Sequence, residues 1–392
     1  MVLKVPDLQF PNETSIEGLY SCVLIQKSPN KFDIVFPEYR TNGQIYNIIR
    51  SVKVVEFDWQ QGTFTELGSY MLPSDIGLNV PQLFKNGVGY DLDNDRILLV
   101  LGEWNGSSLA PVTSNAKIIA VNRSLDAHEV LIDDLLSLVK QAVPDADELR
   151  ENASCFIVNG LGAIVAGVRS GGAERAWHAV STDGGSTWES RHSNDRYDYQ
   201  HEGLEPFWDG DTFMGFLATG HGTNSLWIKT DGSYEANSPG GSFTTVPIYD
   251  MLNNEVIWTE TGSATGAIQH IWYAPPSSPF NATDVTPTGT ITDDEGNTID
   301  LSLVWKMRPH IVMVGGIGYL AFIGCCQGGL GPSDYRVICT QLPVRSGNTY
   351  ELLRYSGGDV IPLVPAGAIF IRAFDLSSKK PLPSPIYNIG AS

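Results

Sequence analysis

The sequence predicts an all-β fold assembled from repeated groups of short strands. Six apolar stretches recur along the 392 residues, and most consist of an apolar run, a turn of Gly, Asp or Asn, and a second apolar run. This alternation is typical of β-hairpins. The chain also contains 40 Gly and 23 Pro, which supply turns, and 42% hydrophobic residues, which suffice for a large core. We therefore expect an ordered, strand-rich chain.

The six stretches divide the chain into units of similar length. They lie near Tyr20, Ile97, Ile157, Phe213, Ile257 and Leu320. Each is expected to open one unit of about four strands, with the two strands of its hairpin innermost. No Pro- or Ser-rich linker separates the units, so we expect a single large domain.

The segment from His178 to Ser190 reads HAVSTDGGSTWES and predicts a tight hairpin. Its Asp-Gly-Gly turn can adopt positive φ angles, and the residues on both sides are strand formers. The short side chains before the turn can accept hydrogen bonds from turn amides, and the Trp after it can fold over the hairpin. The residues to which we assign this structural role are Ser181, Asp183, Gly185, Thr187 and Trp188.

The spacing Ser-x-Asp-x-Gly-x-Thr-Trp resembles the Asp-box of the sialidase-like β-propellers. In that superfamily the box recurs once per blade, at the turn between the third and fourth strands on the outer rim, away from the central pocket. Weaker copies lie at 229–235, 345–351 and 58–66. The resemblance and these spacings imply a β-propeller of six blades. A pair of β-sandwiches is the alternative that short, evenly spaced strands also permit.

One segment departs from the strand pattern. Between His128 and Asn152, Leu131, Leu135 and Leu138 recur at spacings of three and four residues. This periodicity predicts one inserted helix at about 130–143, which Pro144 would end. We expect the helix to pack on the propeller face, with contact to a neighbouring subunit as the alternative.

The C-terminal region predicts a strand followed by an extended arm. We assign residues 1–378 to the propeller and residues 379–392 to a Pro-rich C-terminal arm. The strand AIFIRAF, at 368–374, is expected to complete the first blade and close the ring. The arm is expected to be dispensable for folding and to dock on other protein subunits of an assembly, with a frayed chain end as the equal alternative.

Charge and composition limit the possible partners. The formal net charge is −19 and no Lys/Arg cluster interrupts it, which disfavours nucleic acid. The sequence has no export signal and no long apolar run, so no membrane contact is predicted. We expect a virion component or otherwise a cytoplasmic protein. Five Cys without metal-like spacing predict buried thiols, and neither a metal nor a cofactor is expected.

The resemblance also implies what an active member would need. Sialidases hold the substrate carboxylate with three arginines at the propeller centre, and use a Tyr activated by a Glu as nucleophile with an Asp as acid/base. The nearest candidates for catalysis here are Arg308, Arg336, Arg354, Tyr355, Glu202 and Glu205. None stands in the motif setting in which the family presents these residues.

We therefore expect a non-catalytic propeller that acts as a structural or glycan/receptor-binding module, such as a part of a phage tail or another virion component. An exo-glycosidase of sialidase type with a diverged pocket is the first alternative. A cytosolic scaffold for protein interactions is the second.

Overall fold

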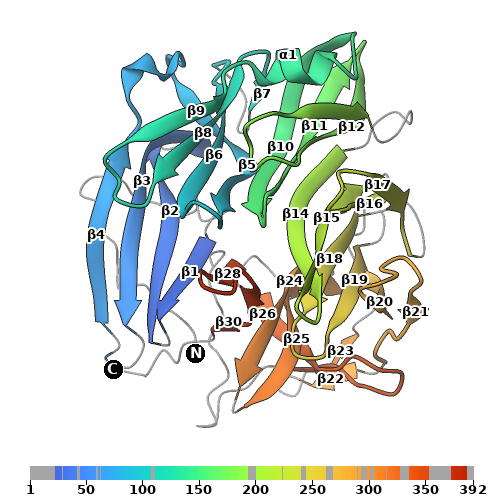
Figure 1. Ribbon diagram of the computed structural model, residues 1–392. Helices are drawn as coiled ribbons and strands as arrows, with labels where there is room; N and C mark the ends of the chain where they lie inside the picture. The colour runs from blue at the N-terminus through green and yellow to red at the C-terminus, as the bar shows by residue number, and fades with distance from the viewer. Residues whose placement is uncertain are drawn as a thin grey trace.

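The computed structural model has a β-propeller fold, in which antiparallel four-stranded meanders surround a common centre (Figure 1). The structure describes residues 23–28, 30–41, 45–58, 61, 63–106, 111–192, 200–222, 224–239, 244–261, 268–288, 290–292, 298–300, 304–314, 316–326, 335–352 and 372–385. Within these ranges the strand pairs form six such meanders, which is consistent with the six-bladed ring that we predict.

The first two meanders consist of β1 (Val23–Ser28), β2 (Lys31–Thr41), β3 (Ile45–Asp58) and β4 (Thr63–Met71), then β5 (Pro81–Asp91), β6 (Arg96–Glu103), β8 (Ala116–Asn122) and β9 (His128–Ile132). The next two consist of β10 (Ala146–Val158), β11 (Leu161–Ser170), β12 (Ala173–Ser181) and β13 (Glu189–His192), then β14 (Gln200–Asp209), β15 (Thr212–His221), β16 (Ser225–Ile228) and β17 (Tyr234–Asn237). The last two consist of β18 (Thr244–Asp250), β19 (Glu255–Thr261), β20 (Ile268–Ala274) and β21 (Thr283–Asp284), then β24 (Val304–Val314), β25 (Ile317–Cys326), β26 (Tyr335–Gln341) and β27 (Glu351–Leu352).

Short elements connect or extend these meanders. They are the 3₁₀ helix Ser74–Ile76, β7 (Val112–Thr113), the hairpin of β22 (Thr290–Thr292) and β23 (Thr298–Asp300), and the C-terminal strands β28 (Arg372–Asp375), β29 (Pro381–Leu382) and β30 (Ser384–Pro385). The outer strands β4, β17 and β21 lie at the periphery, while β1, β14 and β28 lie near the middle of the ring (Figure 1).

The core lies between successive sheets, because the sheets are buried on both faces. On β10, Phe156 and Val158 belong to one apolar cluster, while Cys155 and Ile157 belong to another. All four side chains are fully buried. Successive side chains of a strand point to opposite faces, so a single strand contributes to two cores. Sheets stacked face to face in this way are what a propeller requires.

The meander topology gives the ring two different ends. In an antiparallel meander the turns after the first and third strands lie at one end, and the connections after the second and fourth strands lie at the other. We name these the turn end and the loop end. Each inner strand, such as β5 or β10, therefore begins at the loop end and finishes at the turn end.

Hydrogen bonds between neighbouring meanders tie the turn end together. The Asp93 carboxylate accepts hydrogen bonds from the amides of Asn159 and Gly160 at 2.8 and 2.7 Å. The Asn254 side-chain oxygen accepts one from the Gly210 amide at 2.9 Å. Burial opposes ionisation of Asp93, but bonds from Lys379 and from the two amides hold its pKa below the usual value. These contacts join the second meander to the third and the fourth to the fifth.

The C-terminal strands join the two ends of the chain. β28, which contains the last three residues of the predicted closing strand, pairs in parallel with β1 and so adds a C-terminal strand to the first meander, whereas 368–371 lie outside the described residues. β29 pairs with β28, and β30 pairs in parallel with β24 of the sixth meander. The Phe374 side chain is 1% exposed, and its ring lies 5.7 Å from that of Phe156. The C-terminal segment therefore contacts the first, third and sixth meanders.

The first residues of the Pro-rich arm also contact the ring. The Lys379 ammonium pairs with Asp93, and the Lys380 ammonium pairs with Asp211 at 2.6 Å. Residues 379–385 thus lie against the second, fourth and sixth meanders. This placement weighs against a free arm over that part, whereas residues 386–392 lie outside the described residues.

The inserted helix is shorter than the sequence predicts. Helix α1 spans Leu135–Lys140, with Asp134 as its N-cap. The predicted start of the helix lies instead in β9, which pairs with β8, and β10 begins soon after its end. Four of the six helical residues are buried, and the helix packs against β10, β8 and β13. Its apolar face is thus covered by the ring itself.

Candidate functional site

The box residues lie where the resemblance implies. Ser181 ends β12, and Glu189 begins β13, so the box is the turn between the third and fourth strands of its meander. The Asp183 carboxylate accepts hydrogen bonds from the Thr187 amide at 2.9 Å and the Thr187 hydroxyl at 2.6 Å. The Gly185 amide donates to the Ser181 hydroxyl at 2.8 Å. These hydrogen bonds therefore satisfy polar groups of the turn with partners from the turn itself.

The box contacts the core through Trp188. The half-buried indole donates to the Gly185 carbonyl at 3.0 Å. A Cβ at Gly162 would lie 2.7 Å from the Trp188 ring, so the indole covers this glycine closely. Hydrogen bonds from Thr187 and Ser181 lower the pKa of Asp183 to about 2. These contacts support the predicted structural role.

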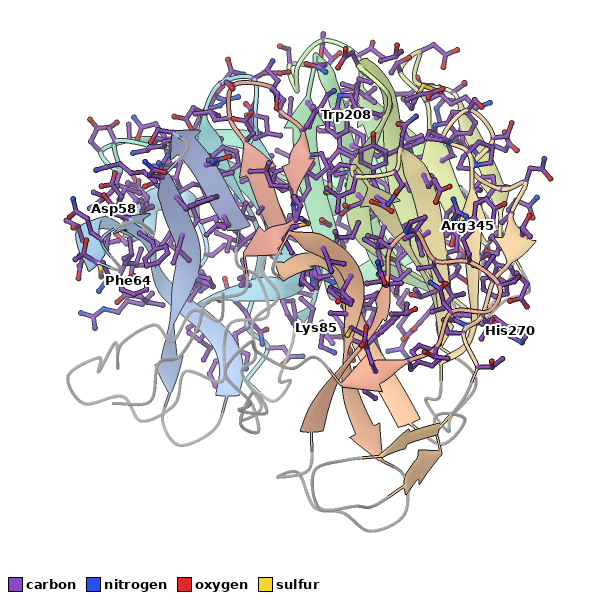
Figure 2. All side chains as sticks on the ribbon, turned by 90° about the horizontal axis from the view of Figure 1, so that it is seen from below. Asp58, Phe64, Lys85, Trp208, His270 and Arg345 are labelled. Atoms are coloured by element: carbon purple, nitrogen blue, oxygen red, sulfur yellow. The ribbon has the colours of Figure 1, made fainter. Side chains whose placement is uncertain are left out.

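The weaker copies occupy equivalent turns. Residues 229–235 connect β16 to β17, residues 345–351 connect β26 to β27, and residues 58–66 connect β3 to β4. Each is the turn between the third and fourth strands of a meander. Asp58 and Phe64 lie at the periphery of the molecule in Figure 2. The boxes consequently mark the turn end of the ring.

The inner strands carry irregularities toward the loop end. The pairing of four inner strands with their neighbours shifts register, which is the sign of a β-bulge. The shifts fall between Leu83 and Val88 in β5, between Arg150 and Ala153 in β10, between His201 and Leu204 in β14, and between Met307 and His310 in β24. Bulges of this kind frequently re-aim side chains beside functional sites.

Polar residues stand at each bulge. Lys85 and Asn86 lie in the bulge of β5, and Glu151 and Asn152 lie in that of β10. Two of the predicted residues, Glu202 and Arg308, fall in the bulges of β14 and β24. We call Lys85, Glu151, Glu202 and Arg308 the bulge residues.

The best-defined contact at these bulges joins two meanders. The Lys85 ammonium lies 2.6 Å from the Glu151 carboxylate, and Lys85 also pairs by backbone register with Asn152. Figure 2 shows Lys85 near the middle of the molecule. The bulges of β5 and β10 are therefore neighbours, although they are far apart in sequence.

Of the remaining predicted catalytic residues, the structure describes Glu205 and the backbone of Arg336. Glu205 follows the β14 bulge and is half-buried. Arg336 lies on β26, the third strand of its meander, and its register partner is Gly324 of β25. On the far side of β25 the same Gly324 pairs with Lys306 of β24. Two strand spacings, about 10 Å, thus separate the backbone of Arg336 from β24. Arg354 and Tyr355 lie outside the described residues.

Sequence reasoning missed Lys85 and Glu151. The only local signal for the β5 bulge is Asn86-Gly87 inside an otherwise apolar strand, because a glycine within a strand pattern often marks a bulge. Among the described residues, no group of three or more His, Cys, Asp or Glu is placed to hold a metal ion. No helix of the described ranges has the length and apolarity needed to cross a bilayer.

Comparison with known proteins relates the chain to others by fold only. No family model matches the sequence, and no curated protein matches it. Among solved structures, a Trypanosoma rangeli sialidase with the inhibitor DANA has a TM-score of 0.44 and 10% identity over 82% of this chain and 54% of that chain. A TolB protein of Agrobacterium tumefaciens has a TM-score of 0.39 and 12% identity, over 77% and 88% of the two chains. A GH43_1 enzyme from Xanthomonas citri has a TM-score of 0.31 and 10% identity, over 73% and 93%. The chain spans about half the length of the sialidases that it matches.

Proposed function

We propose that the chain is a non-catalytic propeller that binds a surface glycan or receptor at its loop end, as one part of a larger assembly such as a phage tail or another virion component. The observation that carries this proposal is the difference between the two ends of the ring. The turn end is tied by hydrogen bonds between meanders and by Lys379 and Lys380. Four inner strands instead carry a bulge toward the loop end, and each bulge contains polar residues.

The chemistry of the described bulge residues supports binding over catalysis of sialidase type. A carboxylate clamp needs several cations that converge on one anion. Lys85 is instead neutralised by Glu151 at 2.6 Å. The acidic net charge of −19 also disfavours accumulation of an anionic substrate.

A diverged exo-glycosidase is the second candidate, and one observation favours it. Glu202 and Arg308 both fall in inner-strand bulges, on β14 and β24. An acid/base carboxylate is a part that a glycosidase needs, and a cation on another inner strand could bind the carboxylate of an anionic sugar.

Activity and binding assays with the same preparations separate these functions. The chain is incubated with a fluorogenic sialoside and a panel of other glycosides, beside the variants Arg308→Ala, Arg336→Ala and Glu205→Ala. Arg191→Ala, on the outer strand β13, is the matched control. A glycan array measures binding by the same proteins.

We expect saturable glycan binding without turnover. Turnover by the wild type that disappears in Arg308→Ala or Glu205→Ala, and persists in Arg191→Ala, would replace the proposal with the glycosidase. Neither turnover nor binding would leave a purely structural subunit.

A further inference from the structure

We infer that the Lys85–Glu151 pair is a ligand contact of the loop end, and that the ligand is an uncharged sugar rich in hydroxyl groups. This inference rests on the proposed function, and it adds the place of contact and the chemical class of the ligand.

The pair is both accessible and fixed. The Lys85 and Glu151 side chains are 45% and 41% exposed, although their charged groups are 2.6 Å apart. Their strands belong to different meanders, and the backbone pair between Lys85 and Asn152 holds the two bulges in register. A ligand can therefore reach charged groups whose positions are set by two rigid sheets.

Backbone conformation at both bulges supports a role beyond folding. Both bulges contain a residue in the left-handed region, Asn86 with φ 60°, which Asn tolerates, and Glu151 with φ 32°, which a Glu rarely adopts. Such conformations persist only where the surroundings impose them, and they cluster at ligand sites. The surroundings here include β7, which pairs with β10, and the Pro111 carbonyl, which accepts from the Glu151 amide at 2.7 Å.

The charges of the pair select the ligand. The Lys85 ammonium can only donate hydrogen bonds, while the ionised Glu151 carboxylate can only accept them. Neighbouring hydroxyls of a sugar do both, so one sugar can bond to each group without separating the charges. A ligand with a net charge would meet a like charge at one member of the pair, and an anion would also meet a chain of net charge −19.

The test uses two single variants and a matched pair elsewhere. Lys85→Gln and Glu151→Gln each remove one charge and keep most of the side-chain volume. Lys31→Gln and Glu56→Gln are the controls, because that pair is also 2.6 Å apart and Lys31 is also 45% exposed, but it joins β2 and β3 of the first meander. The charge-swapped double variant Lys85→Glu/Glu151→Lys retains an ion pair and reports on folding through its melting temperature.

Binding is measured by calorimetry with uncharged oligosaccharides and their sialylated counterparts. We expect binding of an uncharged oligosaccharide that falls at least tenfold in Lys85→Gln and Glu151→Gln, and is unchanged in the two controls. Wild-type binding that both single variants retain would overturn this inference and leave the proposed function intact. Binding of sialylated sugars alone would overturn the ligand class. Failure of the wild type to bind any glycan would overturn this inference together with the glycan-binding part of the proposed function.

Discussion

Two truncated chains distinguish the contribution of β28 to stability from that of the C-terminal arm. A chain that ends after Ser378 loses β29, β30, Lys379 and Lys380 but keeps β28. The Lys379–Asp93 pair is partly exposed, at 30% and 18%, so we expect its loss to cost about 1 kcal/mol or less. In the Lys380–Asp211 pair the Asp211 side chain is fully exposed, so this pair should contribute nothing measurable. The lost pairings of β29 and β30 are each only two residues long, so the melting temperature of this chain should stay within a few degrees of the wild type.

A chain that ends after Ile371 should behave differently, because it also loses β28 and the buried Phe374. Removing a buried Phe side chain costs about 3–5 kcal/mol. Phe374 is 1% exposed and lies against Phe156, so the full-length variant Phe374→Ala should show this cost by itself. With an unfolding entropy of about 2.1 cal/mol/K per residue, the shift is roughly 4–6 °C for 392 residues.

Scanning calorimetry on the two truncated chains and on Phe374→Ala gives the comparison. A Phe374→Ala variant that melts with the wild type would refute closure by β28. An equally large drop for the chain that ends after Ser378 would move the closure into the arm.

Three further predictions concern the box and the sheet contacts. Trp188→Ala should destabilise the chain by about 3 kcal/mol, since the indole covers Gly162, and an unchanged urea midpoint would contradict the structural role. The lowered pKa of Asp183, about 2, means that its stabilising contribution is complete above the unfolded value of 3.8 and is lost as the pH falls through 2; a carboxyl NMR titration near 4 would refute this. Gly89→Ala should prevent normal folding, because its Cβ would overlap the Cys155 carbonyl oxygen; a soluble variant with wild-type circular dichroism and melting would contradict that packing.

The repeated units could be predicted because their signals are local. Turn residues such as Asp183 and Gly185 determine backbone conformation within a few positions. The apolar stretches likewise record burial along each strand, and those near Ile157 and Leu320 coincide with the β10–β11 and β24–β25 hairpins. Both signals can be recognised without knowledge of the rest of the chain.

The helix boundaries could not be predicted, because a distant strand decides them. Leu131 continues the helical spacing in sequence, but β9 pairs with β8 over His128–Ile132, and this long-range pairing overrides the local periodicity. The helix begins only after the Asp134 cap.

The Lys85–Glu151 contact could not be predicted from the sequence either. The two residues are 66 positions apart, and their proximity depends on the parallel approach of β5 and β10. A bulge results from a difference in residue number between two paired strands, so the sequence of one strand rarely reveals it. Asn86-Gly87 in β5 is the one local signal among these two bulges.

All inner strands run in the same direction, so the position of a residue along its strand determines how far it lies from the loop end. Every inner strand begins at the loop end, so its first residues lie near the loop end and its last residues lie near the turn end. On β10, Glu151 precedes Cys155, and Cys155 precedes Val158 by the same rule. Mutational scans along β5, β10, β14 and β24 should consequently change from loss of ligand binding at early positions to loss of thermal stability at late ones. The residue at which one effect replaces the other would measure how far a ligand enters the ring.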